Sequence, residues 1–302
     1  MKSVPRELSG IRDKVARRRV VLEEKAVKKK DRREARKSRE KERERLGSEA
    51  PPKQEPRTLE NTREHDETIV QRGDEAVTEA EQVDEFAGVF GGEVTPKILV
   101  TTGYRATRVT YEFLKDFVAV IPNIVYYKRG QYELKKIVKY ATSKDFTDII
   151  VVREDHKLLT GLVHCHLPDG PTAEYRLTSY LPSGRIRNRG KSTSHTPEVI
   201  LNNFTTRLGR RVGRMIGALF PHNPEFRGRQ AVTIHNQRDF LFFRFHRYVF
   251  SEAGERVRLQ ELGPRFTLKL KSLHGGTFDP AGGEFEWIQK KDMVTSRRRF
   301  VL

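Results

Sequence analysis

The chain has 302 residues, and its 59 Lys and Arg against 41 Asp and Glu give a net charge of +18. A surplus of this size favours polyanionic partners such as nucleic acid or an anionic membrane, and it bears much less on the fold. The single cysteine, Cys165, excludes an internal disulfide and is typical of a reducing compartment. No apolar run approaches the roughly 18 residues of a membrane span, and the N-terminal residues lack an apolar core, so we expect neither a membrane segment nor a signal peptide.

The charge changes sign along the chain. Lys and Arg number 19 against 10 acids in residues 1–50, 4 against 12 in residues 51–95, and 36 against 19 in residues 96–302. These shifts in composition separate three parts of the chain, and the last predicted strand, which ends at 273, sets off a fourth. They are a basic, helix-prone N-terminal arm (1–46), an acidic disordered linker (47–95), a folded domain (96–275) and a basic C-terminal tail (276–302).

The arm is rich in Glu, Lys, Arg and Ala over residues 22–46, which favours a helix with many ion pairs but without an apolar stripe. It is therefore either a solvated, part-helical tail or a basic arm that lies along RNA. One cluster in it is similar to a nuclear-import signal. The cluster consists of Lys28, Lys29, Lys30, Arg32 and Arg33. In the linker, "VDEFAGVF" (83–90) is the one apolar patch, able to dock on a partner or on the edge of the domain.

Hydrophobic periodicity in the folded domain predicts an α/β (α+β) architecture of two similar halves, about 96–182 and 196–275, each a mixed sheet with packed helices. The first half is expected to contain a strand at 98–100, helices at 108–122 and 132–145, and strands at 146–155, 158–168 and 173–180. In the second half, residues 196–204 lead to a helix at 205–221, followed by strands at 230–236, 239–250, 257–262 and 265–273.

One strand is written twice, as "GPTAEYRLTS" from Gly170 and "GPRFTLKLKS" from Gly263. Successive strand residues face opposite sides. The residues expected to face the core are Ala173, Tyr175 and Leu177 in the first copy and Phe266, Leu268 and Leu270 in the second. The outward residues of the first copy have no net charge, and they are Thr172, Glu174, Arg176 and Thr178. Those of the second copy carry a net positive charge, and they are Arg265, Thr267, Lys269 and Lys271. The second copy is either adapted to bind RNA through its cations or an ordinary amphipathic strand with a solvated face. The first copy, with Glu174 among its outward residues, is the better candidate for binding a protein partner.

The helix expected at 205–221 carries a second cationic cluster. Arg207, Arg210, Arg211 and Arg214 fall within an arc of roughly 100° at helical spacing. Such arginines repel one another unless an anion sits among them. Gly209, Gly213 and Gly217 line a third strip, which indicates close approach of a neighbouring element or of a phosphate backbone.

Two further basic stretches complete the predicted RNA-binding set. The loop at 181–197 either follows a phosphate backbone or is mobile, and the strand at 239–250 interleaves arginines with aromatic residues that could stack unpaired bases, although most of its phenylalanines are expected in the core. The cations concerned are Arg185, Arg187, Arg189, Lys191, Arg238, Arg244 and Arg247.

The sequence offers no catalytic or cofactor site. "GRIRNRGKS" (184–192) has one residue too many for a phosphate-binding loop. His164 and His166 share one strand face, but two imidazoles are too few for zinc. Asp145, Asp148, Glu154 and Asp155 are strand-end acids of the kind that commonly faces solvent. No site in the sequence therefore supports a metal, a cofactor or an enzymatic activity, although this alone does not exclude an enzyme.

Several of these stretches together resemble the Brix domain family over about residues 96–275. They are "KILVTTG", "FTDIIVV", "HLPDGPTAEYRL", "ILNNFTTRLGRRVGR", "VTIHNQRDFLFFRFHRYVF" and "LQELGPRFTLKLKSL". Within the family they look most like an assembly factor of the large (60S) ribosomal subunit. The alternatives are a small-subunit member that acts with the U3 particle and, as a different class, an RNA-processing enzyme.

The resemblance implies properties that composition does not reveal. It implies a nucleolar, non-catalytic factor that binds precursor ribosomal RNA, with two halves resembling an anticodon-binding domain. It also implies a smaller partner assembly protein bound to one half, together with other pre-ribosomal factors and ribosomal proteins. The strand at Gly263–Leu270 matches the stretch that the family associates with RNA. Nothing carries over to the arm or the linker, which lie outside the match.

Overall fold

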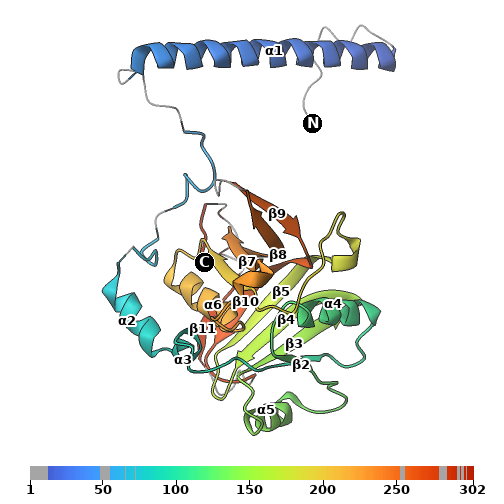
Figure 1. Cartoon of the computed structure of the whole chain (residues 1–302), viewed down its shortest axis with the longest axis vertical. Helices are drawn as coiled ribbons and strands as arrows, with labels where there is room; N and C mark the ends of the chain where they lie inside the picture. Colours follow the sequence, from blue (N-terminus) through green and yellow to red (C-terminus); the bar gives the residue numbers. More distant parts are fainter. Residues whose placement is uncertain are drawn as a thin grey trace. The chain divides into compact units, whose positions relative to one another are not determined.

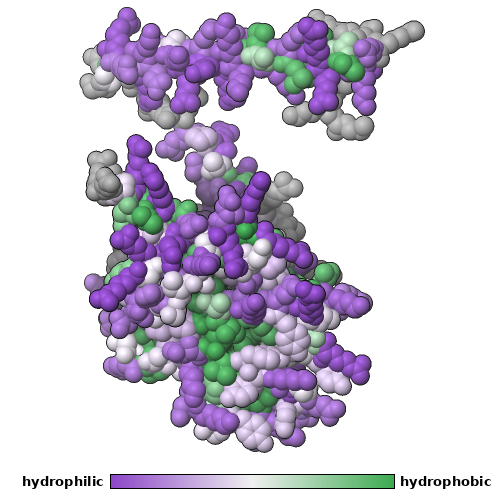
Figure 2. Space-filling model, turned by 45° about the vertical axis from the view of Figure 1, so that its right-hand side comes forward, coloured by the Kyte–Doolittle hydropathy of each residue, from purple (hydrophilic) through white to green (hydrophobic). Residues whose placement is uncertain are grey.

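The computed structural model describes residues 13–47, 55–64, 66–71, 73–251, 256–278, 284–290, 293, 296 and 298–302. The chain divides into two units, one up to Thr58 and one from Leu59 to Leu302. In the first unit, helix α1 (Lys14–Leu46) is capped by Asp13, which accepts a hydrogen bond from the amide of Val15 at 2.9 Å. The helix buries no residue, and its visible side is mostly hydrophilic, with a few scattered hydrophobic residues (Figure 2). Its helicity therefore rests on propensity and local ion pairs, and the nuclear-import cluster lies exposed on it.

The second unit is built on one mixed sheet, with strand order β2-β1-β3-β4-β5-β10-β8-β7-β6 and with β11 on β10 and β9 on β8 (Figure 1). The strands are β1 (Ile98–Thr102), β2 (Ile124–Tyr126), β3 (Asp148–Asp155), β4 (Leu158–His166), β5 (Thr172–Leu181), β6 (Glu198–Asn202), β7 (Gln230–Gln237), β8 (Phe240–Phe250), β9 (Val257–Glu261), β10 (Arg265–His274) and β11 (Phe285–Ile288). The helices are α2 (Glu75–Val83), α3 (Ala87–Phe90), α4 (Arg108–Val118), α5 (Leu134–Thr142) and α6 (Arg207–Gly217), with short 3-10 turns at Ser183–Arg185 and Phe226–Gly228. No helix among the described residues is both long and apolar enough to cross a membrane.

The strand order confirms the prediction of two similar halves. In the first half β1 runs parallel to β3, which continues antiparallel into β4 and β5. In the second half β6 runs parallel to β7, and antiparallel strands β8 and β10 follow in the sheet. The order is mirrored across the centre, where β5 and β10 pair antiparallel, so that Leu177 lies opposite Leu268 and Arg176 opposite Lys269. The strand that the sequence repeats is thus the seam between the halves.

Helices cover the two faces of the sheet unequally. Helices α4 and α6 pack on one face over both halves, and the six inward residues of β5 and β10 are buried beneath them as predicted. On the opposite face α5 covers β1, β3 and β4 of the first half only, through a smaller cluster that includes Ile149 and Cys165. In the described chain, neither apolar cluster includes a residue from the α5 side of β8 and β10. We call this side of β5, β10 and β8 the open sheet face; it carries Arg176, Lys269, Phe240, Phe242 and Arg244.

The linker and the tail differ from their prediction. A disordered linker was expected over residues 47–95, yet α2 and α3 lie in this range, and Phe86 and Val89 are buried in the main core with exposed fractions of 0% and 3%. The reason is the apolar patch at 83–90, which docks on the domain itself. The tail, expected to lie beyond the domain, adds β11 to the edge of β10, and Leu302 is 1% exposed. Residues 48–54, 65 and 72 of the expected linker, and 279–283 of the tail, lie outside the described residues.

Candidate nucleic-acid interface

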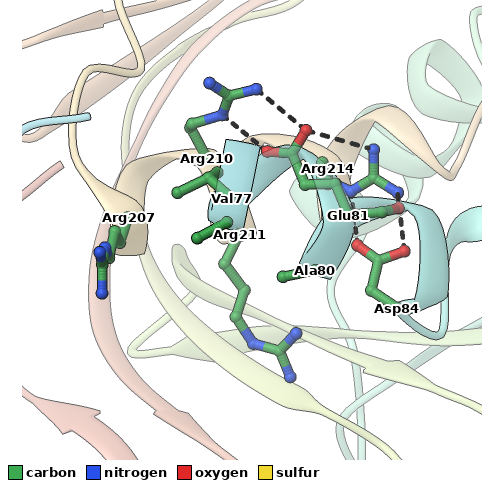
Figure 3. A pocket seen from close by; sticks show the side chains of 9 residues that line it. Val77, Ala80, Glu81, Asp84, Arg207, Arg210, Arg211 and Arg214 are labelled. Carbon is green, nitrogen blue, oxygen red and sulfur yellow. Dashed lines mark hydrogen bonds and ion pairs between the residues drawn. The ribbon is translucent and has the colours of Figure 1, made fainter. Parts of the chain in front are cut away.

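The predicted arginine cluster of α6 is largely occupied by carboxylates of the chain itself. Arg210 forms a bidentate pair with Glu81 at 2.6 and 2.9 Å. Arg214 donates to Asp84 at 2.7 Å and to the carbonyl oxygen of Glu81 at 2.7 Å. Figure 3 shows both guanidinium groups directed at α2, around a hollow of about 230 Å³. The anion that the clustered arginines require is therefore supplied from within the same unit.

The other two arginines of α6 differ in their ion pairs: Arg211 has two carboxylate partners, and Arg207 has none among the described residues. Arg211 binds Glu85 at 2.8 Å and Glu286 of β11 at 2.7 Å. Burial alone would lower the pKa of Arg211, but hydrogen bonds with Glu286 and Glu85 raise it above its ordinary value. Arg207 is exposed and forms no ion pair within the part of the chain that the structure describes. Among the described residues, Arg207 is thus the one arginine of these four without an ion pair, and RNA would have to compete with carboxylates of the chain for the other three.

The segment that follows α2 is held by apolar contacts in addition to the ion pairs of Asp84 and Glu85. Phe86 meets the ring of His166 edge-on at 5.0 Å, and Phe90 stacks on His222 at 4.2 Å. The guanidinium of Arg214 lies over the Phe90 ring at 4.3 Å. Helix α2, in contrast, has no buried residue. Residues 84–90 are thus anchored in the core, whereas α2 is fixed to α6 mainly by its ion pairs.

The glycine strip of α6 also faces neighbours from the same unit. A Cβ atom on Gly209 would come within 2.7 Å of the backbone of Leu302, and one on Gly213 within 3.2 Å of the Phe204 ring. A Cβ atom on Gly217 would meet Leu201 and Phe90 at 3.1 Å. Of the two explanations for these glycines, close packing of neighbouring elements is confirmed for the described residues.

The open sheet face aligns cations across neighbouring strands. Arg153, Gly161, Arg176 and Lys269 lie opposite one another in turn on β3, β4, β5 and β10, and the row continues to Phe240 on β8. Neighbouring strands are about 4.8 Å apart, so like charges placed directly opposite repel each other. Arg153 is paired with Glu174, but Arg176 is exposed and has no ion pair among the described residues. The sequence assigned β5 and β10 to different partners; as neighbours with Arg176 beside Lys269, they present one shared surface.

Strand β8 separates its aromatic residues between the two faces. Leu241, Phe243 and Phe245 are buried in the core, as expected for most of this strand. Phe240 is 39% exposed and Phe242 partly exposed, both on the open sheet face. The ammonium of Lys269 lies 4.9 Å from the centre of the Phe240 ring, and the guanidinium of Arg244 lies 5.8 Å from that of Phe242. Burial, together with the nearby Arg265, lowers the pKa of Arg244, and the carboxylate of Glu261 partly opposes this shift.

The basic loop is fastened beside the start of β10 and, through Ser183, to Asp116 of α4. Ile186 is buried, and a Cβ atom on Gly263 would meet it at 2.3 Å, so the loop is fastened to the start of β10 by an apolar contact. The amide of Gly190 donates to the carbonyl oxygen of Glu261 at 2.9 Å. The side chains of Arg185, Arg187, Arg189 and Lys191 are exposed, with Arg189 donating to the hydroxyl of Ser183. Both the anchor and the exposed cations suit a loop that follows a phosphate backbone.

Three of the four remaining predicted cations are engaged by protein groups. Arg265 forms a bidentate pair with Glu261, and Arg238 pairs with Glu60 at 3.0 Å. Lys271 donates to the side-chain amide of Gln289 at 2.9 Å. Arg247 is partly buried, and its Nε has no hydrogen-bond partner among the described residues. The structure therefore places Lys269 and Arg244 on one face with Arg176, which the sequence reasoning did not include in its RNA-binding set.

The acid Asp148 was expected to face solvent but is fully buried. It accepts hydrogen bonds from His164 Nε2 and His166 Nδ1, both at 2.9 Å. Burial alone would raise the pKa of Asp148, but the two imidazoles lower it to about 2, and the same interaction raises the pKa of His166. No group of three or more metal-ligating side chains in the described ranges has a geometry that could hold a metal ion. This cluster acts as a hydrogen-bonded part of the core.

The fold and the surface together define a duplicated α/β domain with one basic, helix-free sheet face. Residues 103–272 match the Brix domain, and the chain belongs to this family. "Ribosome production factor 1" of Pongo abelii is 50% identical over 298 residues, covering 98% of this chain and 85% of that relative. The protein of the same name from Saccharomyces cerevisiae is 45% identical over 250 residues, covering 81% and 80%. A crystal structure of a probable ribosomal biogenesis protein from Aeropyrum pernix K1 is similar at 17% identity and a TM-score of 0.43, covering 61% of this chain and 98% of that one.

Proposed function

We propose that this protein is a non-catalytic ribosome assembly factor that binds precursor ribosomal RNA during maturation of the large (60S) subunit. Membership of the Brix family and the names of relatives that are about half identical over most of their length support a role in ribosome production. The single structural observation that carries RNA binding is the open sheet face, where Arg176, Lys269 and Arg244 share one face and form no direct ion pair with a carboxylate among the described residues.

The RNA surface in this proposal is smaller than the sequence predicted. It comprises the cations of the open sheet face, the basic loop and the unengaged Arg207 of α6. A phosphate backbone that lies across these groups relieves the repulsion between Arg176 and Lys269 and releases counterions into solution. The remaining arginines of α6 serve to hold α2 in place.

The cellular setting follows from the same proposal. The protein works in the nucleolus, and the exposed Lys28–Lys30 cluster on α1 provides the nuclear-import signal. Its partners are precursor ribosomal RNA, a smaller assembly protein bound to one half of the domain, and other pre-ribosomal factors and ribosomal proteins. No cofactor is required.

RNA binding is tested by removing three charges from the open sheet face. The variant Arg176→Gln, Lys269→Gln, Arg244→Gln should bind a precursor ribosomal RNA fragment at least tenfold more weakly, and its slope of log affinity against log salt should fall by about 2. The matched control removes three exposed lysines around α5, as Lys136→Gln, Lys139→Gln, Lys144→Gln. Equal losses for the two variants would contradict a localised site.

The assignment to the large subunit is tested by crosslinking the protein to RNA in cells and sequencing the attached fragments. Fragments from large-subunit precursor RNA are expected. Fragments from small-subunit precursor RNA or the U3 particle would identify the alternative assignment instead. Cleavage or modification of the precursor by the purified protein would contradict the non-catalytic role.

A further inference from the structure

The open sheet face contains two phenylalanine rings that the binding of a phosphate backbone does not explain. Phe240 and Phe242 alternate along β8 with the core residues Leu241 and Phe243, so they project on the opposite side of the sheet. A single exposed aromatic residue is ordinary on a protein surface. Two exposed aromatic residues on one face of one strand, each with a cation over its ring, form a surface on which flat aromatic groups can stack.

We propose that Phe240 and Phe242 are a stacking platform for unpaired RNA bases, so that the open sheet face selects single-stranded over duplex RNA. This inference rests on the proposed RNA-binding function and deepens it. A nucleobase can stack on an aromatic side chain whatever its sequence, because every base has a π-face. Inside a duplex those faces are already covered by neighbouring bases, so only unpaired nucleotides can use the two rings.

The spacing of the rings supports unstacked bases. Residues two apart on a strand are separated by about 6.8 Å, at a rise of about 3.4 Å per residue. Bases stacked within one strand of a duplex are about 3.4 Å apart. Two successive bases can therefore each cover one ring only when they are separated from each other, as they can be in an extended single strand.

The cations are placed to hold the phosphates that accompany those bases. Lys269 lies directly opposite Phe240 across the strand pair, and Arg176 lies opposite Lys269 on its other side. Arg244 follows Phe242 by two residues on the same strand and face. A base that stacks on Phe240 takes the position of the Lys269 ammonium, which then turns to the phosphate. On the open sheet face, aromatic rings that can stack on RNA bases thus lie next to cations that can bind the RNA phosphates.

The test compares two ring variants with the wild-type full-length protein. One variant carries Phe240→Leu and Phe242→Leu, and the control carries Phe226→Leu, an exposed phenylalanine outside this face. Each is titrated with a short unpaired RNA that contains a fluorescent purine analogue and with an RNA duplex of the same length. Stacking on the wild-type protein should quench the analogue. At about tenfold for each ring, the double variant should lose about a hundredfold in affinity for the unpaired RNA, with little change for the duplex.

The outcomes separate this inference from the proposed function. If the protein binds RNA but the double variant keeps both its single-strand affinity and the quenching, the stacking platform is refuted and RNA binding stands. Equal losses for unpaired RNA and duplex, with unchanged thermal stability, would refute the selection of single strands. If the wild-type protein binds neither RNA, the proposed function and this inference fail together.

Discussion

Arg214 gives the sharpest test of how the chain uses its arginine cluster. Its side chain is 15% exposed and that of its partner Asp84 is 12% exposed, so solvent screens this pair much less than a surface pair. Replacement by Gln removes two charged hydrogen bonds to Asp84, one to the carbonyl oxygen of Glu81 and the contact over Phe90. A charged hydrogen bond contributes about 1.5–3 kcal/mol, and breaking a fully buried pair costs about 3–5 kcal/mol. Because Asp84 keeps a hydrogen bond from the amide of Phe86, we expect Arg214→Gln to cost about 2–3 kcal/mol.

The measurement is the free energy of unfolding from urea titration, with the melting temperature as a second readout. For a domain of this size the expected loss lowers the Tm by about 5–10 °C. Arg207→Gln is the matched control, since it removes an arginine from the same helix without breaking an ion pair among the described residues, and it should cost less than about 0.5 kcal/mol. If the two variants are equally stable, α2 is not held by these pairs, and the arginines would be available to RNA as the sequence suggested.

Three further predictions follow from the same contacts. Raising the salt concentration should accelerate hydrogen exchange in α2 much more than in β8, because ion pairs rather than buried side chains fix α2; equal acceleration would contradict this. Cys165 is buried and its thiol pKa is raised to about 11, chiefly by burial, so a thiol reagent near neutral pH should label it only as fast as the protein unfolds, and immediate labelling would show an open core. The pKa of Asp148 is depressed to about 2 from 3.8, so the stability that its ionised form provides is present above pH 3.8 and lost as the pH falls toward 2. Asp148→Asn should therefore lose stability at neutral pH and flatten that acid dependence, which a urea titration at several pH values would measure.

Local patterns were sufficient to predict much of the fold. The alternation in β10 correctly placed Phe266 and Leu268 in the core, and the helical spacing of Val212 and Met215 correctly identified the buried side of α6. Both are signals that repeat within one element, where the backbone fixes which residues share a face. The Gly-Pro strand that occurs twice in the sequence is also a local pattern, and its repetition predicted the two halves.

The candidate site was harder to predict because it depends on residues far apart in the sequence. Glu81 and Arg210 are 129 residues apart, and Arg176 and Lys269 become neighbours only when β5 pairs with β10. An acidic segment next to a basic domain was a signal for their pairing, yet its low apolar content indicated disorder. Phe86 was identified within an apolar patch, but its burial depended on the core that receives it. The composition thus showed where acidic and basic residues lie in the sequence, but not which of them form ion pairs in the folded chain.

The most direct test of the central claim is to map where RNA touches the protein. Ultraviolet crosslinking of the full chain to a precursor ribosomal RNA fragment, followed by mass spectrometry of the attached peptides, gives the contact residues. We predict crosslinks on β8 and β10, at Phe240, Phe242 and Lys269, and in the basic loop at 185–191. Crosslinks confined to α6 beneath α2, or to α5 itself, would contradict the account.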